Sequence, residues 1–281
     1  MSKGIALVTG AAQGIGRAIA LQLANDGFDV ALNDIPSKKA QLDVVAREVN
    51  AMGHKTLVVC ADVSSEDDIV AMIKDTVEEL GGLDVMVANA GISGSLTPLV
   101  DSSTEAWDTV FAINTRGVYL CYKHAAKQMI AQGRGGRIIG ASSAAGKRGF
   151  PLNAKYSASK FAVRGLTQSA ALEPGKHKIT VNSYAPGIID TPMVQAVYDG
   201  AENELVAATL LATTAAGHMG KPEDIASIVS YLASKEAHFI TGQCVRGDLG
   251  FRVSSRATDV FGTAFRRWRD DFILMDMSFS S

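Results

Sequence analysis

Residues 9–16 read Thr-Gly-Ala-Ala-Gln-Gly-Ile-Gly, and this stretch decides the fold. It separates a short apolar run at residues 4–9 from a stretch at 16–26 whose apolar residues recur at helical spacing. Glycines at a strand-to-helix turn let the backbone bend sharply and approach a pyrophosphate, and the first helical turn offers free N–H groups. The spacing is GxxxGxG, and a tight turn without a ligand would use the same residues. The strand–turn–helix context nevertheless favours a dinucleotide site.

The alternation of apolar run and helical pattern continues along the chain. Further apolar runs lie at 28–34, 54–62, 83–90, 137–143 and 178–186, and helical patterns lie at 37–52, 66–80, 105–132, 156–172 and 222–233. The runs are continuously apolar, as strands that are covered on both faces should be. We therefore predict an α/β fold: a doubly wound parallel sheet of about seven strands, with helices on both faces, in a single domain spanning residues 1–250.

The composition excludes several classes of protein. Of the 281 residues, 47% are apolar, which is enough for a core and too much for a disordered chain. The 29 acidic and 27 basic residues give a net charge of -2, without the basic excess of a nucleic-acid-binding protein. No run approaches the roughly 18 apolar residues that span a bilayer, and the first run is too short for a signal peptide. We expect a cytoplasmic protein that acts on a small molecule and binds neither nucleic acid nor membrane.

The cysteines indicate a reducing compartment. Cys60, Cys121 and Cys244 are far apart, odd in number and match no metal-ligand spacing. We interpret them as buried free thiols and expect no metal site.

Asp34 and Ile35 close the second predicted strand. Asp34 lies 18 residues after Gly16, where a carboxylate can accept hydrogen bonds from ribose hydroxyls and repel a 2′-phosphate. Because residues 33–37 contain no Arg or Lys, although Lys38 follows, the pattern favours NAD over NADP. A simpler alternative is that Asp34 only caps the following turn.

Asp62 and Val63 close the third predicted strand. There a carboxylate and an apolar side chain could meet the edge and face of an adenine ring. The alternative is that residues 62–65 only begin the next helix, since Asp and Ser are common at helix N-termini.

Tyr156 and Lys160 lie one helical turn apart and face the same way. A neighbouring ammonium favours the phenolate, so the pair can act as a general acid/base on a carbonyl or hydroxyl group. The spacing YxxxK also occurs at Tyr119 and Tyr231, but only Tyr156 follows a strand that ends in serine. Ser143, 13 residues upstream, can donate a hydrogen bond to a substrate oxygen there. Tyr119 and Tyr231 are better interpreted as helix surface or packing residues.

Taken together, these motifs resemble the short-chain dehydrogenase/reductase family. The resemblance is carried by residues 9–16, Asp62 and Val63, the Asn-Ala-Gly at 89–91, Asn114, Ser143, Tyr-Ser-Ala-Ser-Lys at 156–160 and Pro-Gly-Ile-Ile-Asp-Thr at 186–191. It implies a Rossmann-type sheet, an NAD-binding catalytic domain at 1–250 and a homo-oligomer, either a tetramer or a dimer. The implied cofactor-binding residues are Gly10, Gln13, Gly14, Ile15, Gly16, Asp34, Ile35, Asp62, Val63, Asn89, Ala90, Gly91, Tyr156, Lys160, Pro186, Gly187, Ile189 and Thr191.

The resemblance also implies a catalytic tetrad. Tyr156 would exchange the proton, Ser143 would orient the substrate oxygen, and Lys160 would lower the pKa of the tyrosine and hold the nicotinamide ribose. Asn114 would hold a water molecule that links Lys160 to solvent. The alternative for Asn114 is a local helix kink or cap.

Within the family, residues 156–172 and 186–193 look most like diacetyl/acetoin reductases and 2,3-butanediol dehydrogenases. The predicted substrate-pocket residues are Ala144, Phe150, Leu152, Met193 and Val197. Because these side chains are mostly apolar, we expect a small or hydrophobic neutral ketone or secondary alcohol, with a ring alcohol of terpenoid type still open. The alternatives are an NADP-linked 3-oxoacyl reductase and, from another class, an NAD-binding regulator without catalysis.

The C-terminal region departs from the family pattern. Arg246 and Gly247 stand where two buried strand residues are expected, and a charge there is costly unless it is paired or outside the sheet. Residues 251–281 then form an atypical tail whose aromatic residues recur at helical spacing. We hypothesise an amphipathic helix that serves as an interface or lid. The alternatives are a disordered tail and an altered reading frame near Cys244.

Overall fold

The computed structural model describes residues 2–198, 215, 217–248 and 250. Its centre is a seven-stranded parallel sheet with the order β3-β2-β1-β4-β5-β6-β7. The strands are β1 (Ile5–Thr9), β2 (Asp29–Asp34), β3 (Thr56–Cys60), β4 (Val85–Ala88), β5 (Gly136–Ala141), β6 (Ile179–Pro186) and β7 (Cys244–Gly247). The predicted α/β fold with a doubly wound sheet is therefore confirmed.

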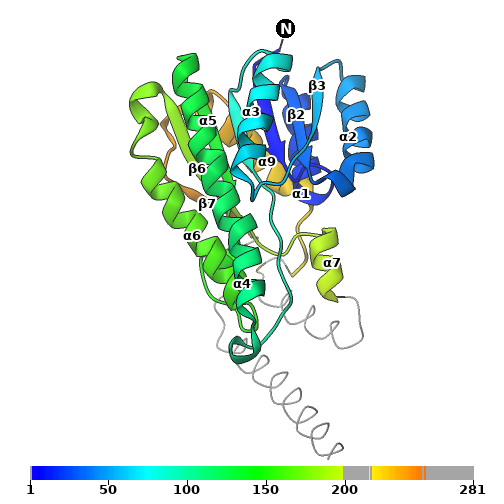
Figure 1. Cartoon of the computed structure of the whole chain (residues 1–281), viewed down its shortest axis with the longest axis vertical. Helices are drawn as coiled ribbons and strands as arrows, with labels where there is room; N and C mark the ends of the chain where they lie inside the picture. The colour runs from blue at the N-terminus through cyan, green and yellow to red at the C-terminus, as the bar shows by residue number, and fades with distance from the viewer. Residues whose placement is uncertain (1, 199–214, 216, 249, 251–281) are drawn as a thin grey trace, which may run out of the picture.

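Helices cover both faces of the sheet (Figure 1). One face carries α1 (Gly14–Asn25), α2 (Lys39–Ala51) and α9 (Pro222–Ala233), and the other carries α3 (Glu66–Leu80), α4 (Thr104–Phe111), α5 (Val118–Gln132) and α6 (Ala154–Ala170). Consecutive strand residues feed opposite cores: Val8 packs with α1 and α9, whereas Leu7 packs with α3 and α5. Both side chains are fully buried, which explains why the strands are continuously apolar.

The helix predicted at 105–132 is divided. The structure has α4, then a π-helical segment at Ala112–Gly117, then α5. The extra residue in each π turn rotates Asn114 inward, where it is completely buried. A second difference concerns the thiols: only Cys121 is buried, Cys244 is half-buried, and Cys60 is exposed at the edge strand β3.

Arg246 avoids the cost expected of a buried charge in β7. Its strand lies at the edge of the sheet, its side chain is 47% exposed, and its guanidinium pairs with the buried carboxylate of Asp248. The predicted tail at 251–281 lies outside the described residues.

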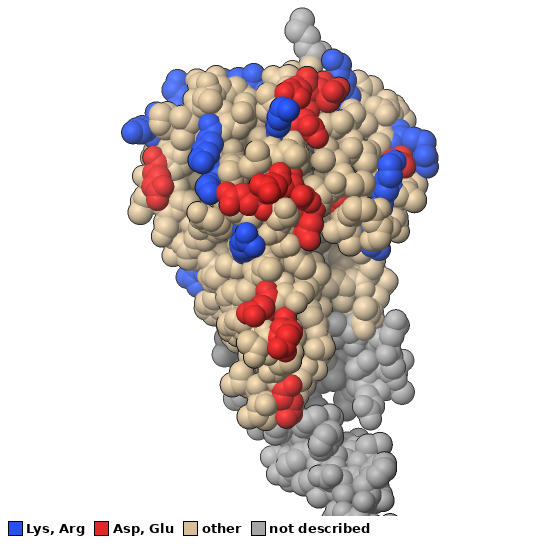
Figure 2. All heavy atoms as spheres, in the orientation of Figure 1, with Lys and Arg blue, Asp and Glu red and all other residues tan. Residues whose placement is uncertain are grey.

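The surface of the α3, α5 and α6 face carries acidic and basic side chains of both signs, interspersed with neutral ones (Figure 2). This face does not show the basic stripe that nucleic-acid binding requires. None of the described helices is long and apolar enough to cross a membrane.

The topology itself creates a crevice. Strand order reverses between β1 and β4, so the connection after β1 runs to one side of the sheet and the connection after β4 runs to the other. In such sheets, ligands bind beyond the carboxyl ends of the strands at this switch point.

Candidate active site

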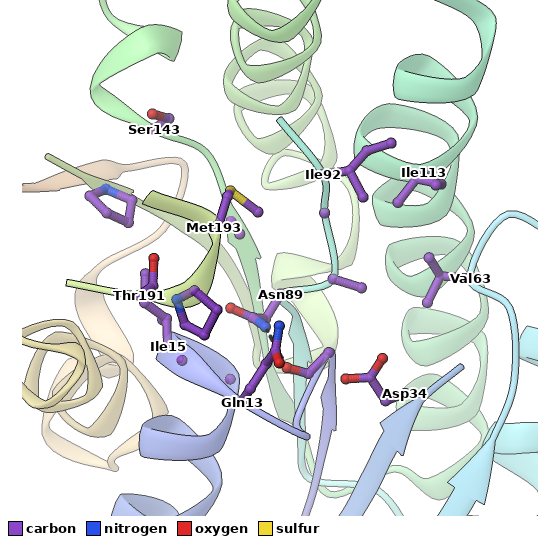
Figure 3. Close-up of a pocket in the computed structure, with 18 of the residues that line it drawn as sticks. Gln13, Ile15, Asp34, Val63, Asn89, Ile92, Ile113, Ser143, Thr191 and Met193 are labelled. Carbon is purple, nitrogen blue, oxygen red and sulfur yellow. Dashed lines mark hydrogen bonds between the residues drawn. The ribbon is translucent and has the colours of Figure 1, made fainter. Parts of the chain in front are cut away.

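A cavity of about 370 Å³ opens at the carboxyl ends of the strands. Figure 3 shows Asp34 and Val63 at one end of it and Ser143 at the other. The predicted residues that line it are Gly10, Gln13, Gly14, Ile15, Gly16, Asp34, Ile35, Asp62, Val63, Asn89, Ala90, Gly91, Ser143, Tyr156, Lys160, Pro186, Gly187, Ile189, Thr191 and Met193. The structure thus brings together residues from every strand-end motif of the sequence.

The glycine turn leaves no room for side chains. Gly10 and Gly14 have φ angles of +65° and +55°, in the left-handed region that glycine adopts without strain. A Cβ on Gly16 would lie 2.0 Å from the carbonyl oxygen of Gly10. Helix α1 begins at Gly14, and its N-cap Gln13 makes no side-chain capping bond. The first backbone N–H groups of α1 and its positive dipole end are therefore available to an anion.

Asn89 locks this turn to the end of β4. Its Nδ2 donates to the carbonyl oxygens of Thr9 at 2.8 Å and Gly10 at 3.2 Å. The phenol of Tyr184, on β6, donates to Asn89 Oδ1 at 2.7 Å. Because each amide atom has its own partner, the orientation of the Asn89 side chain is fixed, and Gly10 is fixed with it.

Asp34 makes the turn-bracing bonds weighed as the simpler alternative and also lies in the cavity wall. Its carboxylate accepts from the N–H of Ala12 at 3.1 Å and from the N–H of Ile35 at 2.9 Å, so it braces the glycine turn and its own turn. It also lines the cavity. Lys38 lines the same end, and its Nζ lies 3.3 Å from Gln13 Oε1. A cation four residues after Asp34 therefore lines the cavity, although residues 33–37 contain none.

Asp62 and Val63 also combine a structural role with a place in the cavity wall. Asp62 Oδ1 accepts from the N–H and the hydroxyl of Ser64, each at 2.8 Å. The N-cap of α3 is Ser65, whose hydroxyl accepts from the N–H of Asp68. Val63 is buried and supplies an apolar surface to the cavity.

Tyr156 and Ser143 meet at the opposite end of the cavity. Tyr156 projects from the first turn of α6, and Ser143 follows β5, so both are placed by rigid elements. Burial raises the pKa of the Tyr156 phenol, and the neighbouring Ser143 hydroxyl acts in the opposite direction. The sequence predicts that Lys160 lowers this pKa, whereas in the structure the pKa is raised and the influences on it are burial and Ser143. The Lys160 Nζ lies 5.5 Å from the centre of the tyrosine ring and donates to the Ala141 carbonyl at 2.9 Å.

Lys160 and Asn114 lie side by side behind the Asn-Ala-Gly segment. A Cβ on Gly91 would approach Asn114 Oδ1 at 3.1 Å and Lys160 Nζ at 3.2 Å. Burial lowers the pKa of Lys160 to about 8. Asn114 does not line the cavity; its Oδ1 accepts from the N–H of Ile92 and its Nδ2 donates to the Ile92 carbonyl, both at 2.8 Å. Its π-helical position agrees with the local kink weighed as an alternative.

Known proteins share this chain over most of its length. A family model described as enoyl-(acyl carrier protein) reductase matches residues 10–252. The short-chain dehydrogenase/reductase eriH of Hericium erinaceus is 54% identical over 251 residues, which cover 89% of this chain and 98% of that protein. The chain belongs to the short-chain dehydrogenase/reductase family.

Two further relatives of this short-chain dehydrogenase/reductase act on different substrates. The 3-oxoacyl-(acyl-carrier-protein) reductase FabG of Staphylococcus aureus is 42% identical over 240 residues, covering 85% of this chain and 94% of that protein. The crystal structure of acetoin dehydrogenase YohF from Salmonella typhimurium matches with a TM-score of 0.79 at 34% identity, covering 89% of this chain and 96% of that chain. The protein is therefore an oxidoreductase that uses a nicotinamide cofactor.

The residues present fit such a cofactor. The glycine turn and the free end of α1 can take the pyrophosphate, since no side chain caps the first N–H groups of that helix and the turn lines the cavity. Val63 offers an apolar face, and Asp34 offers acceptors at the same end of the cavity. Tyr156 and Lys160 stand at the far end, where the reacting ring would lie.

The predicted substrate pocket is placed only in part. Met193, on α7 (Pro192–Tyr198), lines the cavity, whereas the described lining does not include Ala144, Phe150 or Leu152. Ala144 is buried in the turn that packs on α6, the Phe150 ring lies 4.6 Å from the Arg148 guanidinium, and Leu152 points its carbonyl at the N–H of Thr97. The side chain of Val197 lies outside the described residues.

The structure adds residues that the motifs do not name. Among them are Asn33, Lys38, Ala61, Ile92, Ile113, Ala141, Ser142, Tyr184, Pro192 and Val194. Most are neighbours of a predicted residue, so adjacency along the strand end is a signal that could have found them. Tyr184 is the exception, because a tyrosine in a buried strand gives no sign of the distant amide that it contacts.

Proposed function

We propose that the enzyme interconverts a secondary alcohol and a ketone, with NAD as the preferred cofactor and Tyr156 as general acid/base. The substrate is a small or hydrophobic neutral carbonyl compound, such as an acyloin, a diketone or a ring ketone. The observation that carries this proposal is the convergence of Tyr156, Ser143 and Lys160 at one end of a dinucleotide-sized cavity. Among the described residues that line this cavity, no other group combines a phenol with a neighbouring hydroxyl and a neighbouring ammonium.

In the direction of reduction, Tyr156 donates its proton to the substrate oxygen. A nicotinamide cofactor, held by the glycine turn and Lys160, would supply the hydride for the carbonyl carbon, so that the ketone would gain one hydride and one proton and become an alcohol. Ser143 Oγ already accepts from the N–H of Ala145 at 3.1 Å, which leaves its own hydrogen available for the substrate oxygen. Two donors then converge on the atom where negative charge develops.

The raised pKa of Tyr156 suits this role. Burial keeps the phenol protonated near neutral pH, so the acid needed for reduction is present before the substrate binds. For the oxidation of an alcohol, the phenol must first lose its proton, and the neighbouring Lys160 ammonium assists this loss. Lys160 is also placed to hold the nicotinamide ribose, because its side chain lines the cavity next to Tyr156.

Apolar side chains around this end support a neutral substrate. Ile92, Met193 and Val194 line it, and the cations that line the described cavity are Lys38 and Lys160. Since Lys38 stands at the Asp34 end and Lys160 is assigned to the ribose, neither is left for a substrate phosphate. The similarity to a structure described as an acetoin dehydrogenase agrees with a small neutral substrate.

An NADP-linked 3-oxoacyl reductase is the second candidate. Lys38 beside Asp34 could meet a 2′-phosphate, and FabG is the relative that favours this activity. We place it second because Asp34 Oδ1 and Oδ2 are both held by backbone N–H groups, which keeps a negative charge facing the ribose.

The test is a panel of small diketones, acyloins, cyclic ketones and 3-oxoacyl thioesters, each assayed with NADH and with NADPH at equal concentration. The proposal predicts turnover of neutral ketones, with NADH at least roughly tenfold better in kcat/KM. A strong NADPH preference, or turnover of 3-oxoacyl thioesters alone, would favour the second candidate. NADH binding without any turnover would support a non-catalytic regulator.

We further propose a cytoplasmic homo-oligomer. Free cysteines among the described residues suit a reducing compartment. Apolar side chains on α5 and α6 support self-association, because Tyr119, Ile130 and Phe161 are each more than a third exposed. Sedimentation of the full chain at micromolar concentration should give a dimer or tetramer, and a monomer would contradict this proposal.

A further inference from the structure

Lys155 is a buried cation that the proposed reaction does not use. It directly precedes Tyr156 on α6, and only 2% of its surface is exposed. Its Nζ donates to the carbonyl oxygen of Ser95 at 2.8 Å. No carboxylate of the described chain lies within 4.0 Å of this ammonium. A buried ammonium without a counter-ion depends on the dipoles that it touches, so this one contact holds the backbone at Ser95 strongly.

The backbone opposite Lys155 is shaped to the lysine. Gly94 has a φ angle of +67°, and a Cβ there would lie 2.9 Å from Lys155 Cε and 3.1 Å from Val110 Cγ2. The chain therefore crosses the lysine stem at a distance that only glycine permits. The aliphatic part of the Lys155 side chain packs against Gly94, and its ammonium donates a hydrogen bond to the carbonyl oxygen of Ser95.

Residues 92–97 are tied down at two further points. Asn114 holds both backbone groups of Ile92 at 2.8 Å. The N–H of Thr97 donates to the carbonyl of Leu152 at 2.9 Å, and Leu152 has a φ angle of +61°, an unfavourable value for a leucine. Strain of this kind persists where surrounding contacts over-determine the backbone, often beside a functional site. Lys155 holds the middle of the segment through its contacts with Gly94 and Ser95.

We propose that Lys155 is a positioning residue that fixes segment 92–97 and thereby sets the wall of the substrate site formed by Ile92. Ile92, the first residue of this segment and the next residue after the Asn-Ala-Gly motif, lines the cavity (Figure 3). Lys155 acts on ketone selectivity through the backbone and touches neither substrate nor cofactor. The inference rests on the proposed function, because it takes the Tyr156 end of the cavity as the substrate site.

The test uses Lys155→Met in the full-length enzyme, which keeps the stem and removes the ammonium. With NADH saturating, KM for a small ketone should rise roughly tenfold while kcat changes less than about threefold. The Kd of NADH should be unchanged. Hydrogen exchange of the backbone amides in 92–97 should accelerate at least roughly tenfold, with the amides of 10–20 unaffected.

Arg137→Met is the matched control. Arg137 is a partly buried cation whose Nε also donates to a backbone carbonyl, that of Ser234 at 3.1 Å, but it lies at the amino end of β5, away from the cavity. The Arg137→Met variant should lower stability without changing KM or the hydrogen exchange of the amides in 92–97. If Lys155→Met does not fold, Gly94→Ala is tested in its place. The Cβ of an alanine at position 94 would press on the Lys155 side chain, so this variant should also raise KM.

The outcomes separate the two claims. Unchanged hydrogen exchange of the amides in 92–97, or an unchanged KM in Lys155→Met (or in Gly94→Ala where it replaces that variant), would overturn the role of Lys155. If the wild-type enzyme turns over no ketone, the proposed function fails, while the exchange measurement still decides whether Lys155 holds the segment. If kcat falls, KM rises and NADH binding weakens by similar factors, Lys155 has only a general structural role.

Discussion

The two ends of the cavity are built differently. The end of the cavity at Asp34, proposed for the cofactor, consists mainly of backbone: a glycine turn and the first turn of α1, with Asp34 accepting from nearby N–H groups. The end at Tyr156, proposed for the substrate, includes segment 92–97, which is joined to distant parts of the chain by single side-chain contacts such as that of Lys155 with Ser95. The comparison indicates that the glycine turn follows from a local motif, although Asn89 also fixes it from 79 residues away, whereas the wall at 92–97 depends on long-range contacts.

The largest effect on cofactor binding should come from displacing the glycine turn. Gly16→Ala places a Cβ 2.0 Å from the Gly10 carbonyl oxygen, so the turn must move. We expect NADH binding to weaken by roughly 100-fold, equivalent to about 2.7 kcal/mol. Gly165→Ala is the control: its Cβ meets nothing within 4 Å on α6, and alanine should stabilise that helix by about 0.5–1 kcal/mol. Isothermal titration with NADH measures the first effect, and unaltered affinity would mean that the turn does not hold the cofactor.

The next effect concerns the titration of Lys160 at the junction of the two ends. Burial lowers its pKa to about 8 from 10.5, so its charge is lost as the pH rises through that value. The kcat/KM for ketone reduction should be level below about pH 8 and should fall roughly tenfold per pH unit above it.

The free energy of unfolding should change with pH in the opposite direction to kcat/KM. Between about pH 8 and 10.5 the unfolded chain binds a proton at Lys160 that the folded chain lacks, so this group makes the free energy of unfolding increase with pH. Lys160→Met should remove that increase. A rate that stays level to pH 10 in the wild type would contradict the role of the ammonium.

A smaller effect should come from removing the bond that orients Asn89. Tyr184→Phe leaves the buried Oδ1 of Asn89 without its donor, which should cost about 1–3 kcal/mol of unfolding free energy and weaken NADH binding several-fold. Tyr122→Phe is the matched control, because that phenol is equally buried but contacts Thr167 and Asn182. It should lower the Tm in a similar way and leave the Kd of NADH alone. Equal effects of both variants on NADH binding would show that Tyr184 is not a positioning residue.

The smallest expected effect separates the two cofactors. Lys38→Met removes the cation beside Asp34 and should lower kcat/KM for NADPH by roughly threefold to fivefold, as for an exposed ion pair, without altering that for NADH. Lys39→Met removes a neighbouring lysine that instead pairs with Asp43 at 2.8 Å, and it should change neither. If Lys38→Met lowers kcat/KM equally for NADH and NADPH, the proposal that the 2′-phosphate of NADPH lies at Lys38 is contradicted.

The same contrast explains what could be predicted from the sequence. The strands, the glycine turn and the residues at strand ends follow from local patterns, because apolar periodicity and glycine spacing act over a few residues. The π-helical segment at 112–117 was not predicted, since it depends on Asn114 reaching Ile92, 22 residues earlier. Likewise, the Tyr184–Asn89 bond spans 95 residues and the Lys155–Ser95 bond spans 60. Such partners are set by tertiary packing, which local propensity does not contain.

The central claim is that the phenol of Tyr156 carries the proton. The most direct measurement is the single-turnover rate of ketone reduction by Tyr156→Phe, with the Kd of NADH determined on the same sample. Phenylalanine keeps the ring and removes only the hydroxyl. The account predicts a rate reduced by at least roughly 1,000-fold with unchanged NADH affinity. A variant that retains most of the wild-type rate would contradict it.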